Sequence, residues 1–237
     1  MRHWPQATAL CCGGPSVRDM ITLFRRLAIG LCVLLVLLNF SWIRAASAAA
    51  VSEPCDASLL NQAEQRVAAF FGTTKSKPWI RCPVRPRLGV GAGIGATFIS
   101  PGLPSVILLG PDGAGSVDVI AHEWAHAEIA QRVGGLRRNL LMPVWFDEGL
   151  AMQVDWRAHF ETAALRDYLS TETVPGHLDE IASQRGFHQP GRQGSLHYAL
   201  SKCVVGKWLQ EQGGWRGQLE IPAATAPAHL AQCLDDS

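Results

Sequence analysis

A helix-length run of apolar and polar positions lies in residues 117–133, which read VDVIAHEWAHAEIAQRV. Apolar side chains recur there at helical spacing, and neither proline nor glycine interrupts the run. Ser116 is a good N-cap, and Asp118 suits the positive N-terminal end of a helix. Gly134 and Gly135 supply a residue that can close the helix in a left-handed conformation. The pattern therefore predicts a helix over 117–133.

The other periodic segments predict strands before this helix and mainly helices after it. A helix capped by Asp56 is expected to run to Gly72. Short strands are expected at 79–84, 96–100 and 105–109. Further helices are expected from Pro143 onward, at 161–170, at 178–184, at 196–212 after Gly194 and Ser195, and after Pro222.

The helix over 117–133 carries a motif with metal-binding chemistry. His122 and His126 are four residues apart, so both imidazoles project from one face of the helix, about one turn apart. This spacing lets two ring nitrogens bind one metal ion, and Glu123 is placed to hold a water beside that ion. The five residues HEWAH match the H-E-x-x-H pattern of zinc metalloproteases. The alternative is an amphipathic core helix in which the two histidines are incidental.

A hydrolytic zinc site needs three protein ligands and an open position. The metzincin continuation is absent, because Ile129 and Arg132 stand where it requires a glycine and a third histidine. The segment 143–151, PVWFDEGLA, predicts a second helix with an acidic pair, Asp147 and Glu148. Periodicity does not separate these two carboxylates. The pair is also compatible with an ordinary solvated helix face.

At this segment the sequence resembles the gluzincin metallopeptidases, whose second helix carries a W-x-x-E-G-x-A-like motif with the glutamate as third zinc ligand. The matching residue is Glu148, and Gly149 would let the backbones of the two helices approach closely. The resemblance covers 104–156 and, more weakly, 195–212. It implies an α+β, zincin-like fold, with a small mixed β-sheet preceding the active-site helix and a mainly helical C-terminal half. It also makes 105–109 a candidate for peptide binding by strand addition, the alternative being a simple core strand.

The resemblance further implies a mechanism. One Zn²⁺ per chain would be held by His122, His126 and Glu148, and Glu123 would act as general base on a water that attacks a peptide bond. The segment Tyr198–Ser201 resembles a Y-x-x-S-like segment found downstream of gluzincin zinc sites.

On that resemblance Tyr198 would donate a hydrogen bond to the oxyanion, and His197 is a second candidate for this role. A tyrosine packed in the core is the alternative for Tyr198.

One gluzincin branch places an aspartate four residues after the third ligand, where this chain has Met152. Asp155 is nearby in sequence, and whether it reaches a ligand histidine is left open.

The N-terminal region has the pattern of an export signal. Arg25 and Arg26 precede an apolar run at 27–43, and small residues follow at 45–50. This favours a signal peptide over 20–50, with an uncleaved membrane anchor through 27–43 as the alternative. Residues 1–19 fit poorly as the start of a signal, so we expect translation to begin at Met20 and 1–19 to be a non-native extension. The metallopeptidase domain would then comprise 51–237, periplasmic or secreted.

Four of the seven cysteines lie after the signal, which suggests two disulfides in an exported domain. Three pairings are possible, and proximity along the chain favours Cys55–Cys82 and Cys203–Cys233. Four free, buried thiols are the alternative.

Charge and composition limit the partners. The whole chain has a net charge of +1, but five of its basic residues and one acidic residue precede residue 51, so the domain has a net charge of about −3. Without a basic run, nucleic acid is not expected as a partner. A peptide or protein substrate is expected, and a membrane only if the N-terminal segment is uncleaved. Two other classes stay open: a non-catalytic zinc-binding module of the same fold that binds a protein, and a membrane-anchored structural protein.

Overall fold

The computed structural model describes residues 55–82, 95–100, 102–222 and 225–236, together with Arg26, Ile29 and Gly30. The chain divides into two units, Met1–Phe40 and Ser41–Ser237, and the second contains almost all of the described residues. Apart from Arg26, Ile29 and Gly30, the predicted signal peptide lies outside the described residues, as do the start at Met20 and the extension over 1–19. No helix in the described part of the chain is long and apolar enough to cross a membrane.

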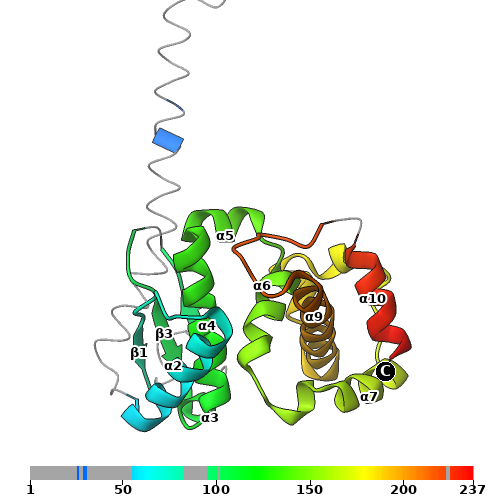
Figure 1. Ribbon diagram of the computed structural model, residues 1–237, viewed down its shortest axis with the longest axis horizontal. Helices are drawn as coiled ribbons and strands as arrows, with labels where there is room; N and C mark the ends of the chain where they lie inside the picture. Colours follow the sequence, from blue (N-terminus) through cyan, green and yellow to red (C-terminus); the bar gives the residue numbers. More distant parts are fainter. Residues whose placement is uncertain are drawn as a thin grey trace, which may run out of the picture. The chain divides into compact units, whose positions relative to one another are not determined.

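A three-stranded mixed sheet precedes the central helix, as predicted. Its strand order is β1 (Trp79–Arg81), β3 (Val106–Leu109), β2 (Gly95–Phe98); β1 pairs parallel with β3, and β2 pairs antiparallel with it (Figure 1). All four residues of β3 are buried. The prediction that 105–109 binds a peptide by strand addition is therefore wrong, because hydrogen bonds to β1 and β2 occupy both edges of β3.

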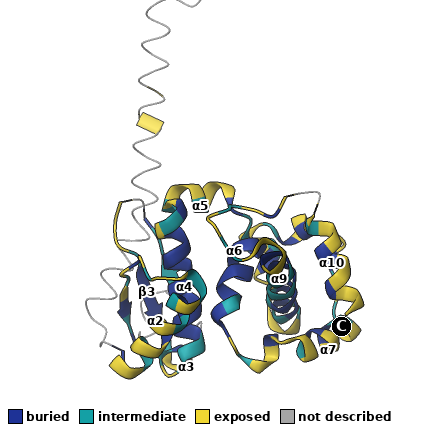
Figure 2. Ribbon diagram, in the orientation of Figure 1, coloured by how far each residue is buried: buried dark blue, intermediate teal, exposed yellow. Residues whose placement is uncertain are grey.

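Helix α4 (Val117–Val133) has the predicted bounds and lies at the centre of the domain. The side chain of Ser116 accepts a hydrogen bond from the amide of Val119, and Gly134 ends the helix with a φ of 88°. Helix α2 (Ala57–Phe71) and the sheet pack on one side of α4, and α6 (Val144–Ala151) packs on another (Figure 1). Most of α4 is buried (Figure 2).

The C-terminal half is helical, as predicted. Its longer helices are α7 (Thr162–Thr171), α9 (Gly191–Gln212) and α10 (Ala226–Asp235). Short helices are α3 (Pro111–Ala114), α5 (Gly135–Leu141) and α8 (Gln184–Phe187), and 3₁₀ turns occupy Met152–Val154, Ala158–Phe160 and Leu178–Ile181. The fold is thus α+β, with its sheet before α4 and helices after it.

Two apolar clusters meet along α4. One contains side chains of α2, the sheet and the first part of α4, including Ile107 and Ile120. The other contains side chains of α6, α9 and the last part of α4, including Phe146, Trp208 and Ile129. Because α4 contributes to both clusters, the residues in its middle lie where the sheet side and the helical side of the domain join.

Some glycines act differently from the prediction. Gly135 begins α5, a helix that was not predicted, rather than helping to close α4. Gly194 lies inside α9, which starts at Gly191 rather than after Ser195. A Cβ at Gly194 would come 2.1 Å from the carbonyl oxygen of Gln189, so glycine is required there because the chain that leads into α9 passes close to its first turn.

Both predicted disulfides are present. Cys55 is bonded to Cys82, with a Cα–Cα distance of 5.0 Å, and Cys203 to Cys233, with a distance of 6.1 Å. The first ties α2 to the end of β1, and the second ties α9 to α10. Two disulfides in a chain of this length indicate an oxidising compartment.

Gly149 permits close packing, but of a different pair of helices from the one predicted. A Cβ on this residue of α6 would lie 2.5 Å from Cγ2 of Val205 and 2.7 Å from the carbonyl oxygen of Ser201. Both neighbours belong to α9, so Gly149 sets the distance between α6 and α9 rather than between α6 and α4.

We therefore expect Gly149→Ala to lower the free energy of unfolding by about 1–3 kcal/mol, because the added methyl group must push α9 away. Gly206→Ala is the matched control, since a Cβ there would come no closer than 3.4 Å to Oε1 of Gln153, which is an ordinary van der Waals distance. Urea unfolding followed by circular dichroism measures both changes. Equal stability of Gly149→Ala and the wild type would contradict the assignment.

Candidate metal centre

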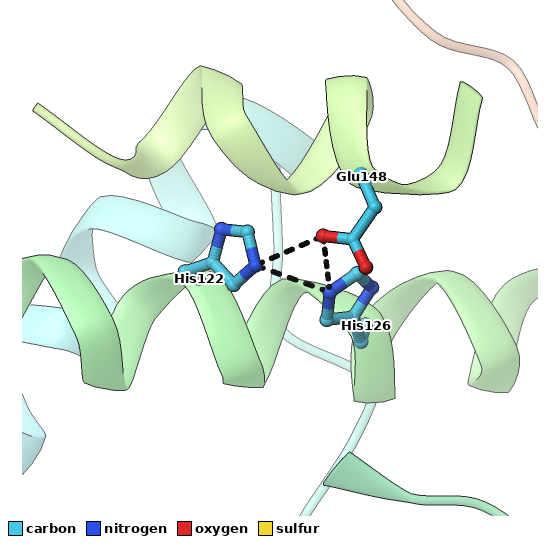
Figure 3. Close-up of side chains that lie close together, drawn as sticks. All are labelled: His122, His126 and Glu148. Carbon is cyan, nitrogen blue, oxygen red and sulfur yellow. Dashed lines mark hydrogen bonds and ion pairs between the residues drawn. The ribbon is translucent and has the colours of Figure 1, made fainter. Parts of the chain in front are cut away.

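Three ligand-type side chains converge between α4 and α6. His122 and His126 extend from one face of α4, and Glu148 extends from α6 toward them (Figure 3). The Nε2 atoms of the two histidines are 3.3 Å apart. Oε2 of Glu148 lies 3.2 Å from Nε2 of His122 and 3.4 Å from Nε2 of His126. The three donor atoms thus form a nearly equilateral triangle.

This triangle has the dimensions of one face of a tetrahedral metal site. Zinc binds imidazole nitrogen and carboxylate oxygen at about 2.0–2.2 Å, and tetrahedral angles then place two ligand atoms about 3.3–3.5 Å apart. The observed separations of 3.2–3.4 Å are close to that value. His122, His126 and Glu148 are therefore positioned to bind one metal ion, with a fourth position left for another ligand.

The chemistry of Glu148 supports the same conclusion. Its carboxylate is buried, and apart from ion-pair contacts with the two histidines its Oε2 atom has no hydrogen-bond donor among the described residues. A buried carboxylate oxygen without a donor is costly, whereas a bound cation would satisfy it. The His–His–Glu set thus fits a metal ion.

The structure also separates the two members of the acidic pair. Asp147 lies on the opposite side of His126, with Oδ2 2.9 Å from Nδ1 of that ring. Arg138 of α5 donates hydrogen bonds to both oxygens of Asp147, and its Nη2 lies 3.1 Å from Nδ1 of His126. Glu148 is therefore a ligand-type residue, and Asp147 contacts the back of a ligand histidine.

Asp155 occupies the corresponding position behind the other histidine. Its Oδ2 lies 3.6 Å from Nδ1 of His122, which is an ion-pair distance but longer than a hydrogen bond. Arg157 holds both oxygens of Asp155. Each histidine therefore has a buried aspartate on its Nδ1 side, and each aspartate has an arginine. The sequence left the reach of Asp155 open, and it did not indicate the two arginines.

These charges perturb one another strongly. Burial disfavours the charged form of His126, but Asp147 and Glu148 outweigh this effect and raise its pKa from 6.5 to about 10. Burial likewise opposes ionisation of Glu148, but His126 and His122 hold its pKa well below the usual value. Arg138 and His126 similarly lower the pKa of Asp147 against the effect of burial. Both carboxyl groups are therefore ionised at neutral pH.

Glu123, next to the first histidine, faces a cavity beside the cluster. This cavity has a volume of about 860 Å³, and its walls include His122, Glu123 and Gly95 of β2. The carboxylate accepts a hydrogen bond of 2.7 Å from the hydroxyl of Thr97. Glu123 thus borders a space that can admit a substrate, and His122 is the candidate ligand that borders the same space.

Tyr198 lines the same cavity from α9. Its ring lies 6.1 Å from the ring of His122, and its hydroxyl lies 3.2 Å from Nδ1 of His188. Burial and the carboxylates of Glu148 and Glu123 raise the pKa of the Tyr198 hydroxyl, which therefore keeps its proton. Tyr198 is thus a protonated donor beside the cluster, as the predicted role requires.

His188 is a further residue at this site, and the sequence did not reveal it. Its Nε2 lies 3.7 Å from Oε1 of Glu148. The residue precedes α9 and belongs to no motif, so only the folded chain brings it to the cluster.

His197, by contrast, is buried with its ring nitrogens 2.7 Å from the carbonyl of Phe187 and 2.9 Å from the amide of Gln193. These contacts satisfy His197 within the core, away from the cluster.

Comparison of the chain with protein-family models, with curated protein sequences and with solved structures gave no match.

We predict that the protein binds one divalent metal ion per chain and that Glu148→Ala lowers the affinity by more than about 100-fold, because a ligand is lost. Asp147→Asn should lower it by only about 10- to 100-fold, because that change affects a ligand indirectly. Glu64→Ala, on the exposed surface of α2, is the control and should bind as the wild type does. Competition titration with a zinc chelator measures all four proteins. Wild-type affinity in Glu148→Ala would exclude this site.

A second prediction concerns the protein after removal of metal with EDTA. Because the pKa of His126 is raised from 6.5 to about 10, its protonated form stabilises the fold fully below pH 6.5. That contribution is lost as the pH rises through about 10. We expect the unfolding free energy of the EDTA-treated wild type to fall more steeply between pH 7 and 10 than that of His126→Gln. Parallel pH dependences in urea unfolding would contradict the charge assignment.

Proposed function

We propose that this protein is an exported zinc metallopeptidase of the gluzincin type. The observation that carries the proposal is the triangle of donor atoms from His122, His126 and Glu148, with edges of 3.2–3.4 Å. One of the three, His122, lines a cavity that Glu123 also lines. Metal ligands alone would suit a structural site. A carboxylate beside them, facing a cavity, is what hydrolysis needs in addition.

The donor set favours zinc. Two imidazole nitrogens and one carboxylate oxygen form a common ligand set of catalytic zinc, and the ligand separations suit tetrahedral coordination. Structural zinc sites instead carry four protein ligands, often cysteines. All four cysteines among the described residues form disulfides.

Zinc bound here would polarise the scissile carbonyl group and lower the pKa of a water molecule. Glu123 would take a proton from the attacking water and deliver it to the departing amine. Tyr198 would donate a hydrogen bond to the negative charge that develops on the substrate's carbonyl oxygen. The substrate is a peptide or protein chain that enters the cavity of about 860 Å³.

The aspartates would support this chemistry from behind the ligands. Asp147 and Asp155 lie on the Nδ1 sides of His126 and His122. A histidine whose Nδ1 carries the proton presents a free electron pair on Nε2, and an aspartate beside Nδ1 favours that tautomer. Export is supported by the two disulfides, which form in oxidising compartments.

The test is the pair Glu123→Gln and Glu64→Gln. Glu123→Gln should retain one zinc per chain, because the residue is not a ligand, and should lower turnover of a cleaved peptide by about 10²–10⁴-fold, because the amide cannot take a proton. Glu64→Gln, an exposed change on α2, should match the wild type in both. Peptide-library cleavage with mass-spectrometric detection measures turnover.

Undiminished turnover in Glu123→Gln would refute this glutamate as the base. A wild type that binds zinc but cleaves no peptide would instead indicate a non-catalytic zinc-binding module.

A further inference from the structure

Strand β2 contacts the side chain of Glu123 directly. The hydroxyl oxygen of Thr97 lies 2.7 Å from Oε2 of Glu123 and 2.9 Å from its main-chain carbonyl oxygen. A hydroxyl group has one proton, and a charged carboxylate is the stronger acceptor. Thr97 therefore donates mainly to Oε2, which fixes one of the two carboxylate oxygens.

Gly95, two residues earlier on β2, places no side chain against the other oxygen. A Cβ at this position would lie 2.8 Å from Oε1 and 2.9 Å from Cγ of Glu123, and 3.0 Å from Cδ2 of Leu109. Any side chain on residue 95 would therefore meet the glutamate. Gly95 also lines the cavity, so the space that it leaves is on the side where a substrate would enter.

We propose that β2 positions the general base: Thr97 holds Oε2 of Glu123, and Gly95 keeps Oε1 accessible to the water that gives up its proton. This inference rests on the proposed function of Glu123. The main chain of Glu123 is fixed by α4, but its side chain has three rotatable bonds. An element outside α4 must therefore fix the carboxylate, and β2 is placed to do so.

Thr97→Val and Thr97→Ser form a matched pair for the test. Valine keeps the shape and the β-branch of threonine but removes the donor, whereas serine keeps the donor. The probe is acetohydroxamate, whose two oxygens bind zinc while a nearby carboxylate accepts its proton. We expect Thr97→Val to bind it about tenfold more weakly than the wild type and Thr97→Ser within about twofold, because a hydrogen bond to a charged group is lost only in the first. Zinc affinity should be unchanged in both.

The same pair separates positioning from substrate binding. For a peptide that the wild type cleaves, Thr97→Val should lower kcat by about tenfold with little change in KM. Thr97→Ser, which keeps the hydroxyl donor, should have a kcat close to that of the wild type. Gly95→Ala should also weaken acetohydroxamate binding, although the Thr97 hydroxyl is intact. Crystal structures of the zinc-loaded variants should show the Glu123 carboxylate displaced in Thr97→Val and Gly95→Ala.

An unmoved Glu123 carboxylate in Thr97→Val, together with wild-type affinity for acetohydroxamate, would overturn the positioning role. Failure of the proposed function gives a different result, namely a zinc-loaded wild type that neither binds acetohydroxamate nor cleaves peptides. In that case the crystal structures of Thr97→Val and Thr97→Ser still decide whether Thr97 holds Glu123.

Discussion

The domain depends on the burial of one carboxylate, Glu148, against two histidines at the junction of its two apolar clusters. Helix α4 contributes side chains to both clusters, and α6 packs on it where they meet. A buried charge with no partner would cost several kcal/mol, so α6 can remain in this place only if Glu148 is compensated. His122 and His126 supply partners within 3.4 Å, and a metal ion would supply a stronger one. The same contacts between Glu148 and the two histidines therefore allow α6 to pack on α4 and form the candidate metal centre.

The charges behind the histidines extend this arrangement into neighbouring elements. Nδ1 of His126 lies close to both Asp147 and Arg138, but it cannot donate to the aspartate and accept from the arginine at once. A proton on Nδ1 directs the ring to Asp147 and leaves Nε2 free to bind a metal, while Arg138 keeps its two bonds to Asp147. Metal binding at Nε2 would therefore select the aspartate contact. Arg138 would then serve to hold Asp147, which links α5 to the candidate metal centre.

The sequence predicted what depends on nearby residues. The caps at Asp56 and Ser116, the face shared by His122 and His126 and the pairing of neighbouring cysteines all follow from local spacing. It could not predict contacts made by distant segments. One such contact is the strand order, which places β3 in the middle of the sheet. Another is the packing of α9 against α6, which makes α9 rather than α4 the neighbour of Gly149. The resemblance, and not the periodicity, selected Glu148 over Asp147. The two residues are adjacent on one helix, and which of them is directed at the histidines depends on the element that packs against that helix.

The residues of the candidate site fall into two groups: the candidate ligands, and the groups that other elements position around them. Only part of the site therefore forms a sequence motif. The ligands lie on α4 and α6, whose separation is fixed by packing in both apolar clusters. The groups that would act on a substrate are set by other elements: Thr97 on the sheet donates a hydrogen bond to Glu123, Gly95 leaves space beside that carboxylate, and Tyr198 reaches the cavity from α9. Two ligands and the base fit within five residues because one helix turn brings them together. Residues that orient a side chain from outside must come from whichever element lies opposite it, and no local spacing encodes that neighbour. A motif of this kind therefore specifies where a metal can bind, whereas the fold around it decides whether the carboxylate beside the metal is held in a position to react.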